Sequence, residues 1–586
     1  MGNLNYGIIG NCKSSALIYE DSSMDWLCLP KFDSASVFGK ILDDKKGGNF
    51  KFQVDDSYRI YQKYEEHTCI LTTTFVSEEG SFKVLDFMPR YKVGPGKYFA
   101  PPQVTRYVKH LTGAPKFSVS YQPNLEYAIG HTKTYIKEDF IVSVLEEPKF
   151  DTLYCYTNAD MQAIVAAKEI SLISDLYFSI SYFEKVDKPS LDSTRLDYER
   201  TRMYWMNWCA KTEVNSQYKE TVLRSAMTLK LLYYEKTGAV LAAATTSLPE
   251  TIGEVRNWDY RFCWIRDASM VIKVVSKLGH ENMVKKYIDY IIDLIPEKDE
   301  SFQIMYGINK ERILTEKSLD HLSGYEGSKP VRTGNAAYIQ QQNDIYGILM
   351  DAIYFQIDHY GLEVHQEEEL WGIVKNVVWL VEQNWQKPDK GIWEFRAEDR
   401  HFTFSKLLCW VAIDRAILIA QKLYPNKTFA DWELLKMQIG DDIYQNAWNN
   451  QVQAYTQSYG SSDMDASVLL MEAYGFIDGK DARFVSTVKK IEEELVHNGL
   501  LYRYKNQDDF GLPSSSFTVC TFWFIEALYK TGQMDKAKEW FDRLLTYGNH
   551  LGLYSEDLDF ESRRMLGNFP QAYSHLAIID VALNFK

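Results

Sequence analysis

The segment ISLISDLYFSISYFEKVDKPSLDSTRLDYERTRMYWMNWCAK, residues 170–211, contains the point at which the hydrophobic period of the chain changes. Before it, β-branched and aromatic residues form short runs separated by turns, as in residues 67–91 and 116–129, and such runs are typical of β-strands. After it, apolar residues recur at positions i, i+3, i+4 and i+7, which is the spacing of amphipathic helices. The sequence therefore predicts a β part followed by a helical part.

The β part is expected to occupy residues 1–192. Its many short strands with frequent turns favour an antiparallel β-sandwich. The stretch YERTRMYWMNWCAK, residues 198–211, has a helical pattern, and we expect a linker helix within residues 193–220. A chain of 586 residues is too long for one core, which agrees with a division into domains.

The helical part, residues 221–586, contains about twelve helix-like segments. They are expected to begin near Thr221, Trp264, Met283, Ile339, Glu368, Phe404, Phe429, Asp465, Arg483, Phe517, Met534 and Asn568. No motif repeats at a fixed period, which argues against a tetratricopeptide or HEAT array. Periodicity does not show whether a ring of helices closes. Three alternatives therefore remain: a bundle, a solenoid, or six hairpins closed into an (α/α)6 barrel.

Composition and charge exclude some partners. The net charge is −15 and the pI about 5.4, whereas nucleic-acid binding requires a basic surface. No stretch approaches about 18 uninterrupted apolar residues, and the first residues lack a signal-peptide pattern, so we expect no membrane association and a cytoplasmic location. Aromatic residues, at 14%, suit either a sugar-binding cleft or an aromatic-rich core.

The eight cysteines are scattered through the chain. None forms a CxxC pair, and no histidine cluster has the spacing of metal ligands, so we predict no metal site. Most of them lie in apolar runs, which favours buried free thiols.

Five segments carry more charged and aromatic residues than packing requires: 245–270, 324–347, 390–417, 501–524 and 551–580. In the first of them, arginines and aspartates are closely spaced, and an Arg–Asp pair can hydrogen-bond to vicinal hydroxyl groups. A structural salt-bridge network is the alternative interpretation of this segment.

Glu394 lies between Trp393 and Phe395 in the third segment. One interpretation is the start of a surface helix. The other is a carboxylic acid that its aromatic neighbours shield from water, which raises its pKa and keeps it protonated as a proton donor.

Several motifs occur in a fixed order along the chain. They are IIGNCKSSALIYEDSSMDWLCLPKFDS (8–34), RNWDYRFCWIRDAS (256–269), PVRTGNAA (330–337), GIWEFR (391–396), HFTFSKLLCWVAIDRA (401–416), YSED (554–557) and LGNFPQAYSH (566–575). Together they resemble glycoside hydrolase family 15, the glucoamylase-like inverting exo-glucosidases. The resemblance spans nearly the whole chain and implies a β super-sandwich, a linker helix and an (α/α)6 catalytic barrel.

The resemblance also implies roles for single residues. Glu394 matches the general acid and Glu556 the general base. Arg266 and Asp267 match the pair that holds the glucose at the non-reducing end, and Arg503 matches, more loosely, a further arginine of that subsite. An inverting enzyme needs its two carboxyls roughly 6.5–9.5 Å apart, with a water molecule between them.

Further substrate contacts are expected from Trp258, Asp259 and Trp393, which match residues near the cleft of the family. Glu556 must be ionised to act as a base, and its polar surroundings in SEDLD suit that state. Neighbouring carboxylates such as Asp557 and Asp559 would raise its pKa, and Arg563 or Arg564 would offset them.

The implied function is an inverting exo-acting α-glucosidase that releases β-D-glucose from α-1,4- or α-1,6-linked gluco-oligosaccharides. The close alternative within the family is an α,α-trehalase. A sugar phosphorylase on a similar barrel, or an inactive sugar-binding protein, is a remoter alternative, because both carboxylates are present. The chemistry requires no cofactor. The β domain could supply a loop to the cleft or mediate a homo-oligomer.

Overall fold

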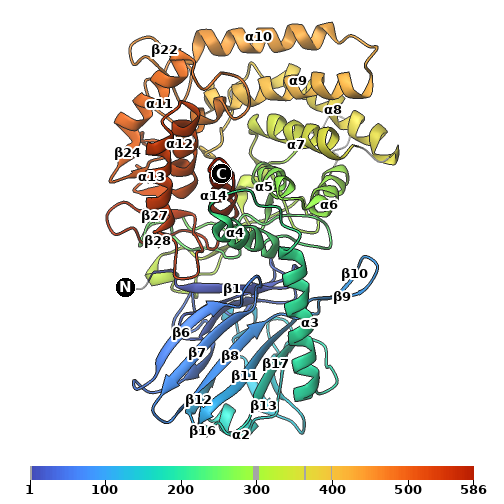
Figure 1. Cartoon of the computed structure of the whole chain (residues 1–586), viewed down its shortest axis with the longest axis vertical. Helices are drawn as coiled ribbons and strands as arrows, with labels where there is room; N and C mark the ends of the chain where they lie inside the picture. The colour runs from blue at the N-terminus through green and yellow to red at the C-terminus, as the bar shows by residue number, and fades with distance from the viewer. Residues whose placement is uncertain (1–2, 295–301, 362–363, 397–398) are drawn as a thin grey trace.

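The computed structural model describes residues 3–294, 302–361, 364–396 and 399–586. The chain forms two parts stacked along the long axis of the molecule, with the β part below and the helical part above in Figure 1. Helix α3 (Leu191–Cys209) runs along the side of the β part and leads into the helical part.

The β part consists of two antiparallel sheets. The first has the order β1 (Tyr6–Gly10), β2 (Ser15–Tyr19), β3 (Met24–Cys28), β5 (Phe50–Gln53), β12 (Lys116–Tyr121) and β16 (Ile170–Ser171), with β4 (Ser36–Phe38) paired to β3. The second has the order β13 (Lys133–Ile136), β14 (Ile141–Leu145), β15 (Asp151–Thr157), β17 (Leu176–Tyr182), β11 (Gln103–Gly113), β8 (Gly80–Phe87), β7 (Leu71–Ser77) and β6 (Arg59–Tyr64).

The core of the β part lies between these sheets. Phe50 of the first sheet and Phe178 of the second are both fully buried, and their ring centroids are 5.4 Å apart. Rings packed edge to face in this way fill the space between two pleated surfaces. The predicted antiparallel sandwich is confirmed.

Helix α3 begins with a reciprocal cap. The Ser190 hydroxyl accepts a hydrogen bond from the backbone N–H of Ser193, and the Ser193 hydroxyl accepts one from the backbone N–H of Ser190. Leu191 and Tyr198 then pack on a small cluster of buried residues of the second sheet. The helix lies near the predicted linker, and the domain limits at residues 192 and 220 stay a prediction.

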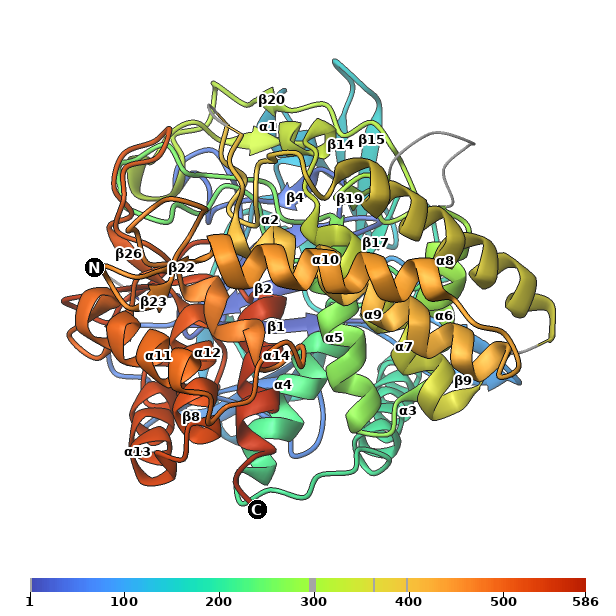
Figure 2. The ribbon, with the colours of Figure 1, turned by 90° about the horizontal axis from the view of Figure 1, so that it is seen from above.

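The helical part is a closed double ring. The inner ring consists of α5 (Ile265–Lys277), α7 (Asp344–Tyr360), α9 (Thr403–Leu423), η3 (Ala466–Met471), α12 (Thr518–Lys530) and α14 (Ala572–Ala582). Each contacts the next, and α14 contacts α5, which closes the ring. The outer ring consists of α4 (Lys219–Leu231), α6 (Glu281–Ile292), α8 (Val364–Asn384), α10 (Ala430–Asn446), α11 (Ala482–Leu495) and α13 (Met534–Leu545), which surround the inner helices in Figure 1. Figure 2 shows the same helices from above, with α10 in front.

Burial explains which helices are inside. In α14 nearly every residue is buried, whereas α13 buries only Ala537, Trp540, Phe541 and Leu544, at the spacing of one helix face. This arrangement is the (α/α)6 barrel, and of the open alternatives the bundle and the solenoid are excluded.

The predicted helix starts need four adjustments. The segment expected near Glu368 begins earlier, at Val364. The segment near Asp465 forms the short 3₁₀ helix η3, which occupies this inner position of the ring. The segment expected near Ile339 begins at Asp344, after a separate 3₁₀ turn at Ala336–Ile339. The last helix begins at Ala572, after the buried loop that contains Asn568.

The two parts are joined by buried hydrogen bonds. The indole N–H of Trp26 donates to the carbonyl of Ala244 at 2.9 Å, and the Asn549 amide donates to the carbonyl of Tyr6 at 2.8 Å. All eight cysteines are buried and form no disulfide. Within the described ranges, we find no helix with the length and apolar character of a membrane span.

Candidate active site

A pocket opens at the end of the barrel where the inner helices begin. Six of the eight predicted site residues line it: Glu394, Arg266, Asp267, Trp258, Trp393 and Arg503. Its interior volume is about 90 Å³. Every described lining residue lies at position 242 or later, so the β part contributes no described side chain to the wall.

Glu394 is held in an unusual backbone conformation. Its φ angle is +60°, in the left-handed region that residues other than glycine rarely adopt. Its carboxylate oxygen Oε1 accepts a hydrogen bond from the indole N–H of Trp264 at 2.9 Å, and Trp264 is the residue before α5. Strain of this kind persists only where neighbouring contacts impose it, and it is common at functional sites.

The pKa of Glu394 is raised above its usual value, chiefly because the side chain is removed from bulk water. The positive charge of Arg266 and the hydrogen bond from Trp264 act in the opposite direction. Helix α9 begins only at Thr403, so Glu394 is not the start of a helix. The structure agrees with an acid that retains its proton.

The two sequence neighbours of Glu394 pack on other aromatic rings. Trp393 turns toward Trp523 and Phe517, with ring centroids 6.2 and 5.8 Å away, and Phe395 packs on Phe402. Their role is to anchor the segment on both sides, while Trp264 contacts the carboxylate.

Arg266 lies in the first turn of α5 and is fixed from several directions. It donates to Asp267 at 3.1 Å, to Asp344 at 3.3 Å and to the carbonyl of Ile392 at 3.3 Å. Asp344 is buried and is the first residue of α7, so two neighbouring inner helices orient one guanidinium group. The bonds to Asp344 and Ile392 join α5 to α7 and to the segment that contains Glu394.

Glu556 lies directly behind the pocket wall rather than in it, and its side chain is 1% exposed. It interacts with the hydroxyl of Tyr260, a residue of the wall, and its Oε2 accepts from the backbone N–H of Asn568 at 3.1 Å. Its Oε1 is buried without a partner among the described residues. The negative charges of Glu556 and Glu394 both act on Tyr260, which places this ring near both carboxyls.

The expectation that polar surroundings keep Glu556 ionised is wrong. Burial, and then the negative charge of Glu250, raise its pKa to about 8. The negative charge of Glu556 contributes in turn to the raised pKa of Asp557. Neither predicted arginine compensates: Arg564 pairs with Glu326 and Arg563 donates to the carbonyl of Asn498, each away from the pocket. Arg503 provides the nearby positive charge instead.

Gly567 makes room for Glu556. A Cβ atom at position 567 would lie 2.6 Å from both Cβ and Oε2 of Glu556, and the φ angle of +72° favours glycine as well. The residue thus fixes where the Glu556 carboxyl can lie.

Arg503 is paired with an acid that the sequence analysis did not single out. Its guanidinium donates to Oε2 of Glu250 at 3.1 Å, and both side chains are buried in the pocket wall. Glu250, Glu556 and Asp557 are therefore all near this one cation, and the negative charge of Glu250 adds to the effect of burial on the pKa of Glu556.

Asp259 is not a substrate contact. It is fully buried and forms a bidentate ion pair with Arg261, whose guanidinium also donates to the carbonyl of Ser34 in the β part. Here the structural salt bridge, the alternative interpretation of this segment, is correct, because Arg261 connects the two parts of the chain.

Trp258 does line the pocket, near its mouth. The guanidinium groups of Arg332 and Arg396 each lie 4.3 Å from its ring, and the ring of Phe510 meets it edge to face at 5.6 Å. Stacked cations hold an aromatic ring in place.

One loop, residues 504–511, contributes Asp508, Asp509 and Phe510 to the pocket wall, and we call it the strap. Asp508 accepts from Arg256 at 2.5 Å, and Asp509 accepts from the backbone N–H of Arg396, two residues after Glu394. The strap therefore connects Arg256 to the segment that carries Glu394.

Some site residues were missed from the sequence. Tyr260 and Trp264 lie inside the quoted motif RNWDYRFCWIRDAS, and Tyr573 inside LGNFPQAYSH, so their position was visible but their role was not. Glu250 and Asp508 carry no local signal, because their partners are more than 250 residues away.

Comparisons with known proteins agree with this site. The model of glycosyl hydrolases family 15 matches residues 216–583, and one described as trehalase-like, N-terminal, matches residues 5–149. The chain belongs to glycosyl hydrolases family 15 and is a glycoside hydrolase.

Curated relatives cover the whole chain. A protein named trehalase from Thermoplasma volcanium is 35% identical over 98% of this chain and 92% of its own, and one from Mycobacterium tuberculosis is 33% identical over 99% and 89%. Among solved structures, a bacterial glucoamylase complexed with acarbose aligns with 100% of this chain and 95% of its own, with a TM-score of 0.72 and 12% identity, which supports the fold.

Proposed function

We propose that the protein is an inverting α,α-trehalase, with Glu394 as general acid and Glu556 as general base. The observation that carries the proposal is the pair of carboxyls beside one ring, Tyr260, in a pocket whose wall holds the arginine Arg266. The full-length relatives named trehalase favour trehalose as the substrate over the α-gluco-oligosaccharides that were expected first from the sequence.

In the proposed reaction, Arg266 and Asp267 hold one glucose of the substrate by its hydroxyl groups. Glu394 donates its proton to the oxygen that joins the two sugars, and the bond from this oxygen to the anomeric carbon breaks. Glu556 removes a proton from a water molecule, which attacks the same carbon from the opposite face. One glucose leaves as the β anomer, and both carboxyls then return to their starting protonation states by exchange with solvent.

Glu556 must lose a proton for this step. Because its pKa is raised, the carboxyl of Glu556 favours its protonated form at neutral pH. The positive charge that develops on the sugar ring, together with Arg503, favours the ionised form in the transition state. The site thus matches the transition state better than the resting state, which is the condition for catalysis.

The strap favours a disaccharide over a longer chain. It connects the segment that carries the acid to Arg256, and it places Asp508, Asp509 and Phe510 in the pocket lining. A chain that extends past the second sugar would have to displace these contacts.

The test is glucose release measured in parallel on trehalose, maltose, isomaltose, kojibiose and nigerose. We expect trehalose to have the highest kcat/KM. Higher values on maltose or isomaltose would favour the exo-α-glucosidase instead, and release that depends on phosphate would favour a phosphorylase.

The stereochemistry of the products is a second test. Inversion of α,α-trehalose yields β-glucose from the attacked sugar and α-glucose from the leaving sugar, so fresh product should contain both anomers equally by proton NMR. Only α-glucose at early times would exclude inversion.

A further inference from the structure

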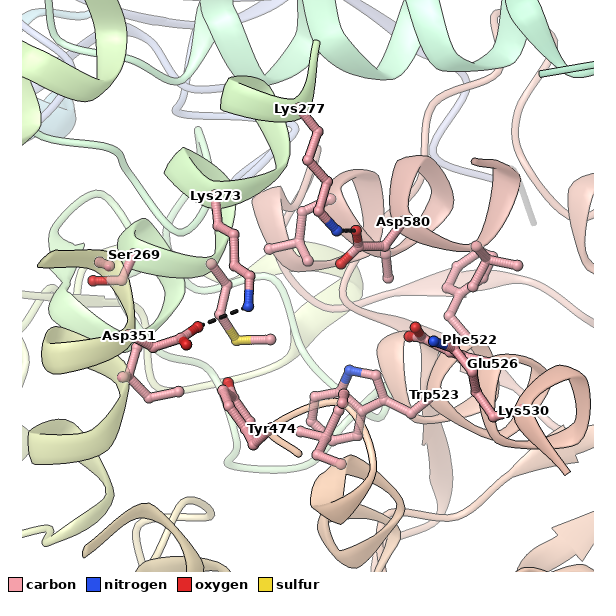
Figure 3. Close-up of a pocket in the computed structure, with 18 residues that line it drawn as sticks. Ser269, Lys273, Lys277, Asp351, Tyr474, Phe522, Trp523, Glu526, Lys530 and Asp580 are labelled. Atoms are coloured by element: carbon pink, nitrogen blue, oxygen red, sulfur yellow. Dashed lines mark hydrogen bonds and ion pairs between the residues drawn. The ribbon is translucent and has the colours of Figure 1, made fainter. Parts of the chain in front are cut away.

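A second cavity lies on the axis of the barrel, further along the inner helices than the catalytic pocket (Figure 3). On α5, Arg266 and Asp267 line the catalytic pocket, and the later residues Met270, Lys273 and Lys277 line the second cavity. Its interior volume is about 170 Å³, several times the roughly 30 Å³ that one water molecule occupies in the liquid.

The charged groups of this cavity balance. Its wall contains three lysines and three acids: Lys273, Lys277, Lys530, Asp351, Glu526 and Asp580. Two pairs are already formed, Lys273 with Asp351 at 2.7 Å and Lys277 with Asp580 at 2.6 Å. An ion that entered would meet both signs of charge, so the cavity does not select an anion or a cation.

Three polar groups in the wall have no hydrogen-bond partner among the described residues: the Glu526 carboxyl, the Tyr474 hydroxyl and the Trp523 indole N–H. Figure 3 shows the Tyr474 oxygen and the Trp523 nitrogen turned into the space between the helices. Burial and Asp580 raise the pKa of Glu526 to about 7, so that its carboxyl both donates and accepts near neutral pH. Unpaired donors and acceptors that converge on one space define a polar binding site.

We propose that this cavity binds a neutral polyhydroxy molecule of monosaccharide size. Hydroxyl groups provide a donor and an acceptor at each oxygen, which matches the mixed set of acids, amines and hydroxyl in the wall. The indole of Trp523 offers an apolar face for the C–H side of a sugar ring. An apolar ligand would leave these polar groups without water or partner, at a cost in free energy.

The second cavity is separated from the catalytic pocket by one layer of side chains. The ring of Trp523 lies 6.2 Å from that of Trp393 and 6.0 Å from that of Tyr573, both of which line the catalytic pocket. The Tyr573 hydroxyl donates to the sulfur of Met270, a residue of the second cavity, at 3.1 Å. The proposal rests on this cavity alone, and only the expected number of bound glucose molecules also assumes that the catalytic pocket binds one.

The experiment is equilibrium dialysis of the full chain with radiolabelled D-glucose as the probe. We expect the wild type to bind two glucose molecules per chain. Arg266→Ala, which impairs the catalytic pocket, should bind one. Ala352→Leu, which fills the second cavity from α7, should also bind one, and the double variant none.

Two further variants keep the test independent of folding defects. Ala577→Leu fills the cavity from α14, and Glu526→Ala removes an unpaired carboxyl and should weaken the second binding event about tenfold or more. Glu382→Gln, at an exposed position on α8, is the matched control and should bind like the wild type. Two results overturn the proposal: folded Ala352→Leu and Ala577→Leu proteins that bind as much glucose as the wild type, or an Arg266→Ala protein that binds none.

Discussion

Trp264 and Glu394 are 130 residues apart in the sequence, yet the indole N–H of one donates to the carboxylate of the other at 2.9 Å. This bond joins the start of α5 to the loop before α9. The backbone of Glu394 has a positive φ angle. The carboxyl is therefore positioned both by its own main chain and by the indole of Trp264 from a second segment.

Trp264→Phe should therefore lower kcat, by about tenfold, because the acid loses the contact that orients it. The bond also lowers the pKa of Glu394, so its loss should shift the basic limb of the pH–rate profile to higher pH. The measurement is kcat/KM on trehalose across pH. Trp379→Phe, at an exposed position on α8, is the control, and a profile unchanged in Trp264→Phe would contradict this role.

Glu394→Gln and Glu556→Gln should each lower kcat by about 10²–10⁴-fold, since each removes one proton-transfer step. Steady-state rates on trehalose measure this, with circular dichroism to show that the fold is intact. Near-normal turnover in either variant would remove that residue from the mechanism.

Glu250→Gln should shift the acidic limb of the profile to lower pH. The negative charge of Glu250 raises the pKa of Glu556, so without it Glu556 loses its proton at a lower pH and the base becomes active earlier. Glu254→Gln, an exposed acid of the same loop, is the matched control. If the acidic limb does not move, Glu250 does not control the protonation of the base.

Gly567→Ala should lower kcat with little change in KM, because the added methyl group would collide with Glu556 and not with the residues that hold the sugar. Gly372→Ala is a matched control, since nothing lies within 4 Å of the added carbon there. As a helix-interior glycine, Gly372 should gain roughly 0.5–1 kcal/mol of stability on the same change. Equal kcat in the two variants would contradict the packing argument.

Asp508→Ala should release the strap from Arg256 and admit longer substrates. We expect the ratio of glucose release from maltotriose to that from trehalose to rise. Asp463→Ala, which removes a surface acid outside the pocket, serves as the control. A ratio that stays the same, with trehalose activity intact, would show that the strap does not limit substrate length.

The sequence by itself determined which part of the chain is β and which is helical, and its resemblance to a family predicted the two carboxyls. Runs of β-branched residues and helical spacing are local properties, so the sandwich and the helices were predictable, as were Arg266 and Asp267 inside one motif. The family resemblance supplied the barrel, which periodicity alone left open.

Only the tertiary structure decided which charges meet. Asp259 and Asp267 look alike in the sequence, but Asp259 is neutralised by Arg261 against the β part, whereas Asp267 faces the pocket. Glu556 looked polar in its local run, yet burial and Glu250 raise its pKa. Electrostatic energies depend on distance and exposure to water, and both are set by the packing of segments that lie hundreds of residues apart.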